Sequence, residues 1–232
     1  MWWVLLILLV ALVGVFWKRQ ELGDKANPIL AALVVIALVV AIMSLSRGRG
    51  RRQVKLEPDF YAAAGEKLGA AIAADIPGGG TVLVIHAGRM NDIYSKVAAA
   101  HIEGLKKGFG NVPFQVVEEG PRPEDEADTV ILMEGALPLN VLQRYLAKVG
   151  EVAAVVSMVG APEVVGRPPA GLPPIYLLGQ VDPAMADELL RTGTIHGAVC
   201  YKDDADWKTP PRSDMSLDEI FNLRYVLLRP PR

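Results

Sequence analysis

The sequence predicts a transmembrane hairpin of two helices followed by a three-layer, Rossmann-like α/β domain with a mostly parallel sheet of about six strands. Three observations support this prediction. Two almost uncharged apolar runs fill most of the first 46 residues. After them, short apolar runs rich in β-branched residues alternate with segments of helical periodicity, as in a parallel sheet covered by helices. The remaining chain, about 175 residues, is long enough for one domain with its own core.

The apolar runs are residues 2–17 and 29–46, and a short polar turn separates them. Each is close to the lower limit of about 17 residues for crossing the hydrocarbon core of a membrane. Asn27 suits the cap of the second helix, and Pro28 suits its first position. A signal peptide would begin with basic residues, and two all-apolar helices are unusual in a soluble core. We therefore expect residues 1–46 to span a membrane twice. The residues expected to flank the membrane are Trp2, Trp3, Trp17, Arg47, Arg49, Arg51 and Arg52.

Residues 47–58 are expected to form a basic linker, and residues 59–232 the α/β domain. The segment after the second apolar run carries more Lys and Arg than the turn between the runs. By the positive-inside rule, this excess favours an integral membrane protein whose domain lies on the cytoplasmic side. A periplasmic or extracellular domain stays open. In either orientation the lipid bilayer is the first expected partner, and the basic segment also suits anionic lipid.

Helices and strands alternate in the first half of the domain. Phe60, Ala64 and Leu68 recur at helical spacing, whereas TVLVIH has the composition of a strand buried on both faces. Gly108 and Gly150 are placed to end helices. The expected helices are 59–75, 92–108 and 138–149, and the expected strands are 81–86, 114–119, 129–134 and 152–158.

The second half begins with a segment, 161–174, whose five prolines exclude a regular helix. Strands are expected at 175–179 and 195–201, with a helix between them that Asp182 caps and Arg191 ends. Ser216 and Glu219 have the spacing of a capping box, which predicts a single helical turn. The alternating residues 221–228 predict a last strand at a sheet edge, because prolines follow them.

Three segments, 98–110 (AAAHIEGLKKGFG), 146–160 (LAKVGEVAAVVSMVG) and 175–204, together resemble one lobe of a type-1 periplasmic-binding-protein domain. This is the fold of sugar-binding transport receptors. The resemblance implies an α/β lobe and ligand binding at the strand ends. The chain departs from the family in two ways, because it has room for one lobe only and has the proline-rich segment 161–174 where the family has a helix.

Ligands of open α/β sheets bind beyond the carboxyl ends of the strands. The candidate ligand-binding residues at those ends are His86, Arg89, Asn91, Glu134, Ser157, Gln180 and Asp182. His86 forms an acid–base pair if the fold brings it to Glu134 or Asp182. Simpler roles stay open, because Asp92 and Asp182 suit helix caps, and Glu118 and Glu119 suit a solvated edge.

The sequence contains no motif for a cofactor, a metal or a catalytic nucleophile. G-x-G-x-x-G after a strand, the phosphate-binding P-loop, H-E-x-x-H and paired Cys/His spacings are all absent. Cys200 is the single cysteine and lies in an apolar run, which favours a buried role. The net charge of −2 gives no indication of nucleic-acid binding. We therefore expect a non-enzymatic protein without cofactors.

Two functions fit these observations. The first is a membrane-anchored accessory or structural subunit that contacts other membrane protein subunits or copies of itself. An uncharged hairpin offers a packing surface and no transport pathway, which favours this role. The second is a small-molecule sensor or binding protein that holds a sugar or metabolite at the strand ends. An enzyme of unfamiliar type is a third possibility, and it requires a turnover that depends on His86.

Overall fold

The computed structural model describes residues 57–88, 90–121, 136–163, 169–179 and 181–230. The chain divides into two units, Met1–Leu56 and Glu57–Arg232, and every described residue belongs to the second. The predicted hairpin and the predicted strand 129–134 lie outside the described residues. Within the described ranges, no helix is both long and apolar enough to cross a membrane.

A six-stranded sheet forms the centre of the domain, in the order β2-β1-β4-β6-β7-β8. The strands are β1 (Gly80–Ile85), β2 (Phe114–Glu119), β4 (Ala154–Ser157), β6 (Ile175–Leu178), β7 (Gly197–Tyr201) and β8 (Tyr225–Leu228). The first five are parallel, and β8 pairs antiparallel with β7 at the edge. The prediction of an α/β domain with a mostly parallel sheet of about six strands is confirmed.

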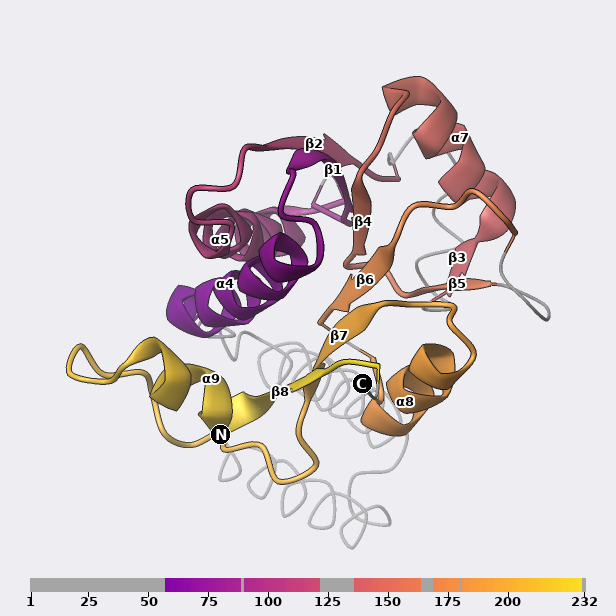
Figure 1. Ribbon diagram of the computed structural model, residues 1–232. Coiled ribbons are helices and arrows are strands. Elements are labelled where there is room, and N and C mark those ends of the chain that lie inside the picture. The colour runs from indigo at the N-terminus through magenta and orange to yellow at the C-terminus, as the bar shows by residue number, and fades with distance from the viewer. Residues whose placement is uncertain (1–56, 89, 122–135, 164–168, 180, 231–232) are drawn as a thin grey trace, which may run out of the picture. The chain divides into compact units, whose positions relative to one another are not determined.

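Helices cover both faces of this sheet, as Figure 1 shows. On one face lie α4 (Pro58–Asp75), α5 (Asp92–Gly108) and α9 (Leu217–Arg224), and on the other lie α7 (Leu139–Val149) and α8 (Pro183–Arg191). Alternate residues of each strand enter the two cores, so that Val82 and Val84 pack under α4 and α5 while Leu83 and Ile85 pack toward α7. Apolar residues on both sides of each strand explain why these strands are continuous apolar runs.

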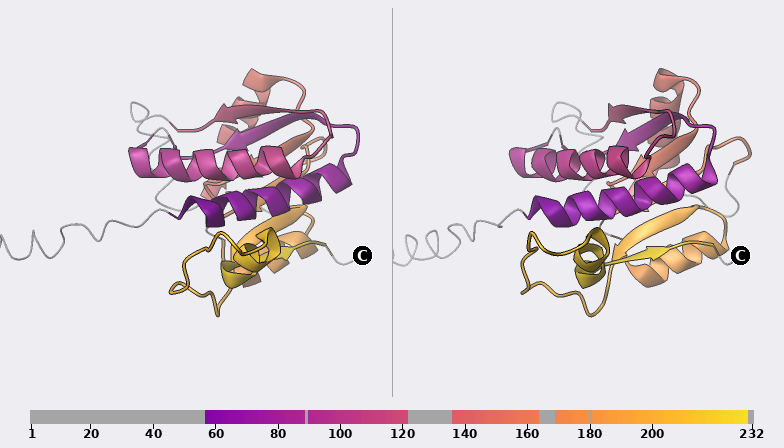
Figure 2. Two further views of the ribbon diagram at one scale, coloured as in Figure 1. Left: turned by 90° about the vertical axis from the view of Figure 1, so that its left-hand side faces the viewer. Right: turned by 60° about the vertical axis from the view of Figure 1, so that its left-hand side comes forward.

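Helices α4 and α5 run side by side and pack backbone against backbone (Figure 2). Gly65 and Gly69 of α4 face α5, and Gly104 and Gly108 of α5 face α4. A Cβ atom on Gly104 would lie 2.8 Å from the carbonyl carbon of Ala62 and closer still to its oxygen. Side chains larger than hydrogen therefore do not fit between the two helices at these positions.

A second, two-stranded sheet pairs β3 (Ala136–Pro138) with β5 (Ala161–Glu163) in parallel. Strand β5 opens the proline-rich segment. The described parts of that segment, 161–163 and 169–174, contain no helix, in agreement with the prediction.

The prediction of a strand over 221–228 is wrong for its first half. Residues 217–224 form α9, and only Tyr225–Leu228 form a strand. The Ser216 hydroxyl accepts the Glu219 N–H at 3.3 Å, and the Glu219 carboxylate accepts the Ser216 N–H at 2.7 Å. This capping box starts the helix, and burial of Phe221 and Arg224 on one helical face extends it beyond the single turn expected.

Candidate functional site

The chain reverses its direction across the sheet between β1 and β4. From β1 it proceeds outward through α5 to β2, and it returns through α7, on the opposite face, to β4. The carboxyl ends of β1 and β4 therefore form the switch point at which α/β sheets bind ligands. Ile85 pairs with Ser157 at this point, and the Met158 N–H donates to the Ile85 carbonyl at 2.8 Å. His86 follows β1 directly.

His86 is buried, and hydrogen bonds fix the orientation of its ring. The Gly88 N–H donates to His86 Nδ1 at 2.9 Å, which makes Nδ1 an acceptor. In a neutral ring Nε2 then carries the proton, and it lies 3.3 Å from Oε2 of Glu118. The Glu118 side chain is 46% exposed, so its carboxylate faces both His86 and solvent. A Cβ on Gly88 would lie 2.6 Å from Nδ1, so only glycine allows this close approach.

A second charged pair lies beside His86. The carboxylate of Glu119 is buried and forms an ion pair with Lys148 of α7. The Glu119 carbonyl also accepts the His86 N–H at 3.0 Å. The expectation that Glu118 and Glu119 are both solvated is therefore wrong for Glu119. Its neighbour Glu118 is the more exposed of the two carboxylates.

Three predicted site residues have structural roles in the described domain. Asn91 caps α5 by accepting the N–H groups of Ile93 and Tyr94, so the cap is Asn91 and not Asp92. Asp182 caps α8, which confirms that alternative. The buried Ser157 hydroxyl donates to the Gly160 carbonyl at 2.6 Å. The predicted residues Arg89, Glu134 and Gln180 lie outside the described residues, so the proposed pairing of His86 with Glu134 stays a prediction.

The opposite, amino-end edge of the sheet holds two cavities that share His196. The smaller, about 360 Å³, lies against Asp75, Tyr176 and Arg229. The Tyr176 hydroxyl donates to Asp75 Oδ2 at 3.0 Å, and Arg229 forms an ion pair with the same carboxylate. Burial, followed by the bond to Asp75, raises the pKa of Tyr176. Sequence reasoning missed this group because its members come from the end of α4, the start of β6 and the residue after β8.

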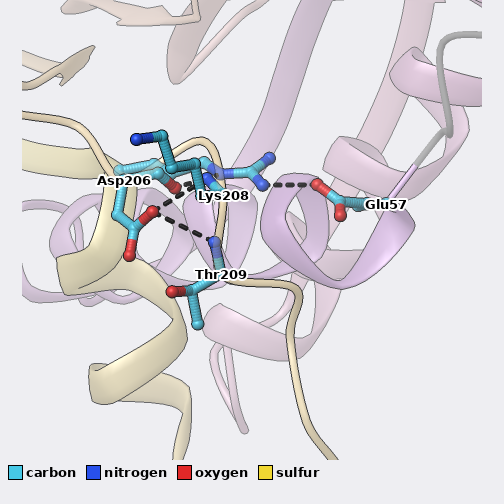
Figure 3. A network of polar contacts seen from close by, with 5 residues as sticks. Glu57, Asp206, Lys208 and Thr209 are labelled. Atoms are coloured by element: carbon cyan, nitrogen blue, oxygen red, sulfur yellow. Dashed lines mark hydrogen bonds and ion pairs between the residues drawn. The ribbon is translucent and has the colours of Figure 1, made fainter.

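A buried ion pair joins the last residue of α9, Arg224, to Glu57, the residue before α4. Arg224 pairs with Glu57, and its guanidinium lies 3.5 Å from the centre of the Phe60 ring. Arg224 Nε also donates to the Asp206 carbonyl at 3.1 Å. Figure 3 shows the Asp206 carboxylate accepting from Lys208 and Thr209, and bonds from Thr209 and then Lys208 lower the pKa of Asp206. These contacts hold the loop around Asp206, the end of α9 and the start of α4 together.

Metal-binding clusters are absent from the part of the chain that the structure describes, since no three His, Cys, Asp or Glu side chains gather there. Cys200 of β7 is fully buried, as its apolar surroundings predict. Burial, and to a smaller degree Asp182, raises the pKa of its thiol to about 12.

Comparison with known proteins finds no matching family model and no matching curated protein. Solved structures of solute-binding proteins are similar to the chain. A sugar-binding protein of a sugar ABC transporter from Bacillus halodurans has 15% identity and a TM-score of 0.42, and the match covers 60% of this chain and 45% of that one. An ABC transporter solute-binding protein from Burkholderia graminis, in complex with D-arabinose, has 18% identity and a TM-score of 0.40 over 60% and 46%. The chain thus spans less than half the length of these proteins, and similarity at this level carries no inference about function.

Proposed function

We propose that the α/β domain binds a small, neutral, hydroxyl-rich molecule, such as a sugar or a related metabolite, at the carboxyl edge of its sheet. The observation that carries this proposal is the pair of His86 and Glu118 at the switch point between β1 and β4. The exposed Glu118 carboxylate has lone pairs for ligand hydroxyl groups, and charge-assisted bonds of this kind are about twice as strong as neutral ones. His86 holds this carboxylate in place from the buried side.

The described groups favour binding over catalysis. The Gly88 N–H donates to Nδ1 of His86, and Nε2 lies 3.3 Å from Glu118, so both ring nitrogens are already in polar contacts within the protein. The Ser157 hydroxyl is committed to a backbone carbonyl. The Cys200 thiol is buried with a raised pKa, which keeps it protonated and unreactive. Neither of these two groups is an activated nucleophile.

The proposal includes a membrane anchor formed by residues 1–46, with the domain on the cytoplasmic side. The two apolar runs and the Arg cluster after them support this part of the proposal. Protease digestion of sealed right-side-out and inverted vesicles tests the orientation, because only the accessible domain is cut. An accessory-subunit role shares this anchor, but no observation in the described domain favours it over ligand binding.

Calorimetric titration of the full chain in mild detergent, with D-arabinose, D-ribose, D-glucose and D-galactose as probes, tests the proposal. Glu118→Gln removes the charged acceptor and keeps the shape of the side chain. Glu103→Gln is the matched control, because Glu103 is an exposed glutamate that pairs only with Lys107 among the residues described. We expect at least one sugar to bind, with about a tenfold loss in Glu118→Gln and none in Glu103→Gln. Equal binding by the two variants, or no binding of any probe by the wild type, contradicts the proposal.

A further inference from the structure

Apolar side chains and hydrogen-bonding groups line both cavities at the amino-end edge. The larger, about 620 Å³, is lined by Leu172, Ile175 and neighbouring prolines together with Thr192 and Thr194. The smaller contains the Asp75–Arg229 ion pair. His196 lines both, so the two cavities lie side by side. Volumes of this size lie in the range of about 300–1,000 Å³ typical of small-molecule sites.

Two side chains with hydrogen-bond donors, His196 and Arg229, line the smaller cavity. His196 is exposed, and no hydrogen bond to its ring nitrogens occurs within the described ranges. Arg229 uses one NH2 group on Asp75, and a guanidinium has five N–H donors in all. The Asp75 carboxylate is satisfied on both oxygens, by Tyr176 and by Arg229. A ligand at this place can therefore accept hydrogen bonds from His196 and Arg229, whereas the Asp75 carboxylate is already paired.

From this arrangement we propose a second ligand site, which takes an amphipathic carboxylate at the amino-end edge of the sheet. The ligand carboxylate lies between His196 and Arg229, and its apolar body lies in the larger cavity against Leu172 and Ile175. Arg229 suits this role because a guanidinium binds a carboxylate through parallel N–H bonds. The site is independent of the proposed sugar site, which lies at the other end of the strands.

Titration of the full chain with 3-phenylpropionate tests this site, with 3-phenylpropionamide as the uncharged control. The chain has three histidines, so ring carbon labelling gives three NMR signals that report on the two edges and the core separately. We expect a saturable shift of the His196 signal with a dissociation constant of about 1 mM. This weak affinity is typical of a ligand with only about ten non-hydrogen atoms. The amide should bind at least about tenfold more weakly.

Arg229→Met should abolish the shift, whereas Arg191→Met should leave it unchanged. Arg191 is the matched control, because it is an exposed arginine that also pairs with a carboxylate, Glu188. The proposal is overturned if the acid and the amide act alike in the wild type, or if Arg229→Met behaves as Arg191→Met does. No saturable shift up to about 20 mM, some twentyfold above the expected constant, also overturns it. A shift of the His86 signal alone overturns it too and leaves the carboxyl-edge proposal standing.

Discussion

Substituting Gly104 by Ala tests the close packing of α4 and α5. The new methyl group would lie 2.8 Å from the Ala62 carbonyl carbon and 2.9 Å from the Glu66 nitrogen, where ordinary contacts begin at 3.4 Å. These neighbours are backbone atoms, so no side-chain rotation relieves the overlap, and the helices must separate by on the order of 1 Å. Overpacking of this kind destabilises the fold by about 3 kcal/mol. The higher helix propensity of alanine offsets about 1 kcal/mol of this loss.

We therefore expect Gly104→Ala to lower the free energy of unfolding by about 2 kcal/mol, which lowers the melting temperature by about 4–8 °C for a domain of this size. Urea unfolding followed by circular dichroism measures it. Gly78→Ala is the control, because a Cβ there meets nothing within 4 Å, and its effect should stay within about 0.5 kcal/mol. If Gly104→Ala is as stable as Gly78→Ala, the reasoning from helix separation is wrong.

Three further predictions concern buried groups. Burial lowers the pKa of His101 to about 3, below the unfolded value of 6.5. The stability that depends on a neutral His101 is therefore fully present above pH 6.5 and is lost as the pH falls toward 3. His101→Phe should remove much of this loss, measured by urea unfolding at pH 7 and pH 4.5. Replacing Arg224 by Met leaves the Glu57 carboxylate unpaired and should cost about 3 kcal/mol, with a change in Trp207 fluorescence because Arg224 lies 5.1 Å from that ring. The Cys200 thiol, with its pKa raised to about 12 by burial, should resist maleimide at pH 8 until urea unfolds the domain.

Each of these predictions has a contradicting outcome. An unchanged pH dependence in His101→Phe shows that other groups control acid unfolding. A cost for Arg224→Met no larger than that of the exposed Arg191→Met, about 0–1 kcal/mol, shows that the buried pair is not important for stability. Rapid labelling of Cys200 in the folded domain contradicts its burial.

The sheet was predictable because strands that are buried on both faces appear in the sequence as short, continuous apolar runs. Residues 82–85, 154–157 and 175–178 are all fully buried apolar or small residues, and no helical period fits such short runs. The segment 221–228 was ambiguous, since it alternates like a strand while a capping box precedes it. The structure shows that the capping box determines the first half of this segment.

The candidate site was only partly predictable. His86 was found because it follows a buried strand, but its described carboxylate partner is Glu118 and not Asp182. Strand register explains this, since Val84 pairs with Glu118, and His86 lies on the same face as Val84, two residues further on. Register between distant strands cannot be read from one sequence. The same limit hid the pair of Asp75 and Arg229, which are 154 residues apart.

Native mass spectrometry of the full chain, purified from its own cells in mild detergent, tests the central proposal most directly. We predict a protein that carries a reproducible small mass increment of a hydroxylated compound, which Glu118→Gln loses and Glu103→Gln keeps. A stable complex with other subunits and no small ligand would contradict the binding proposal and favour the accessory-subunit role instead.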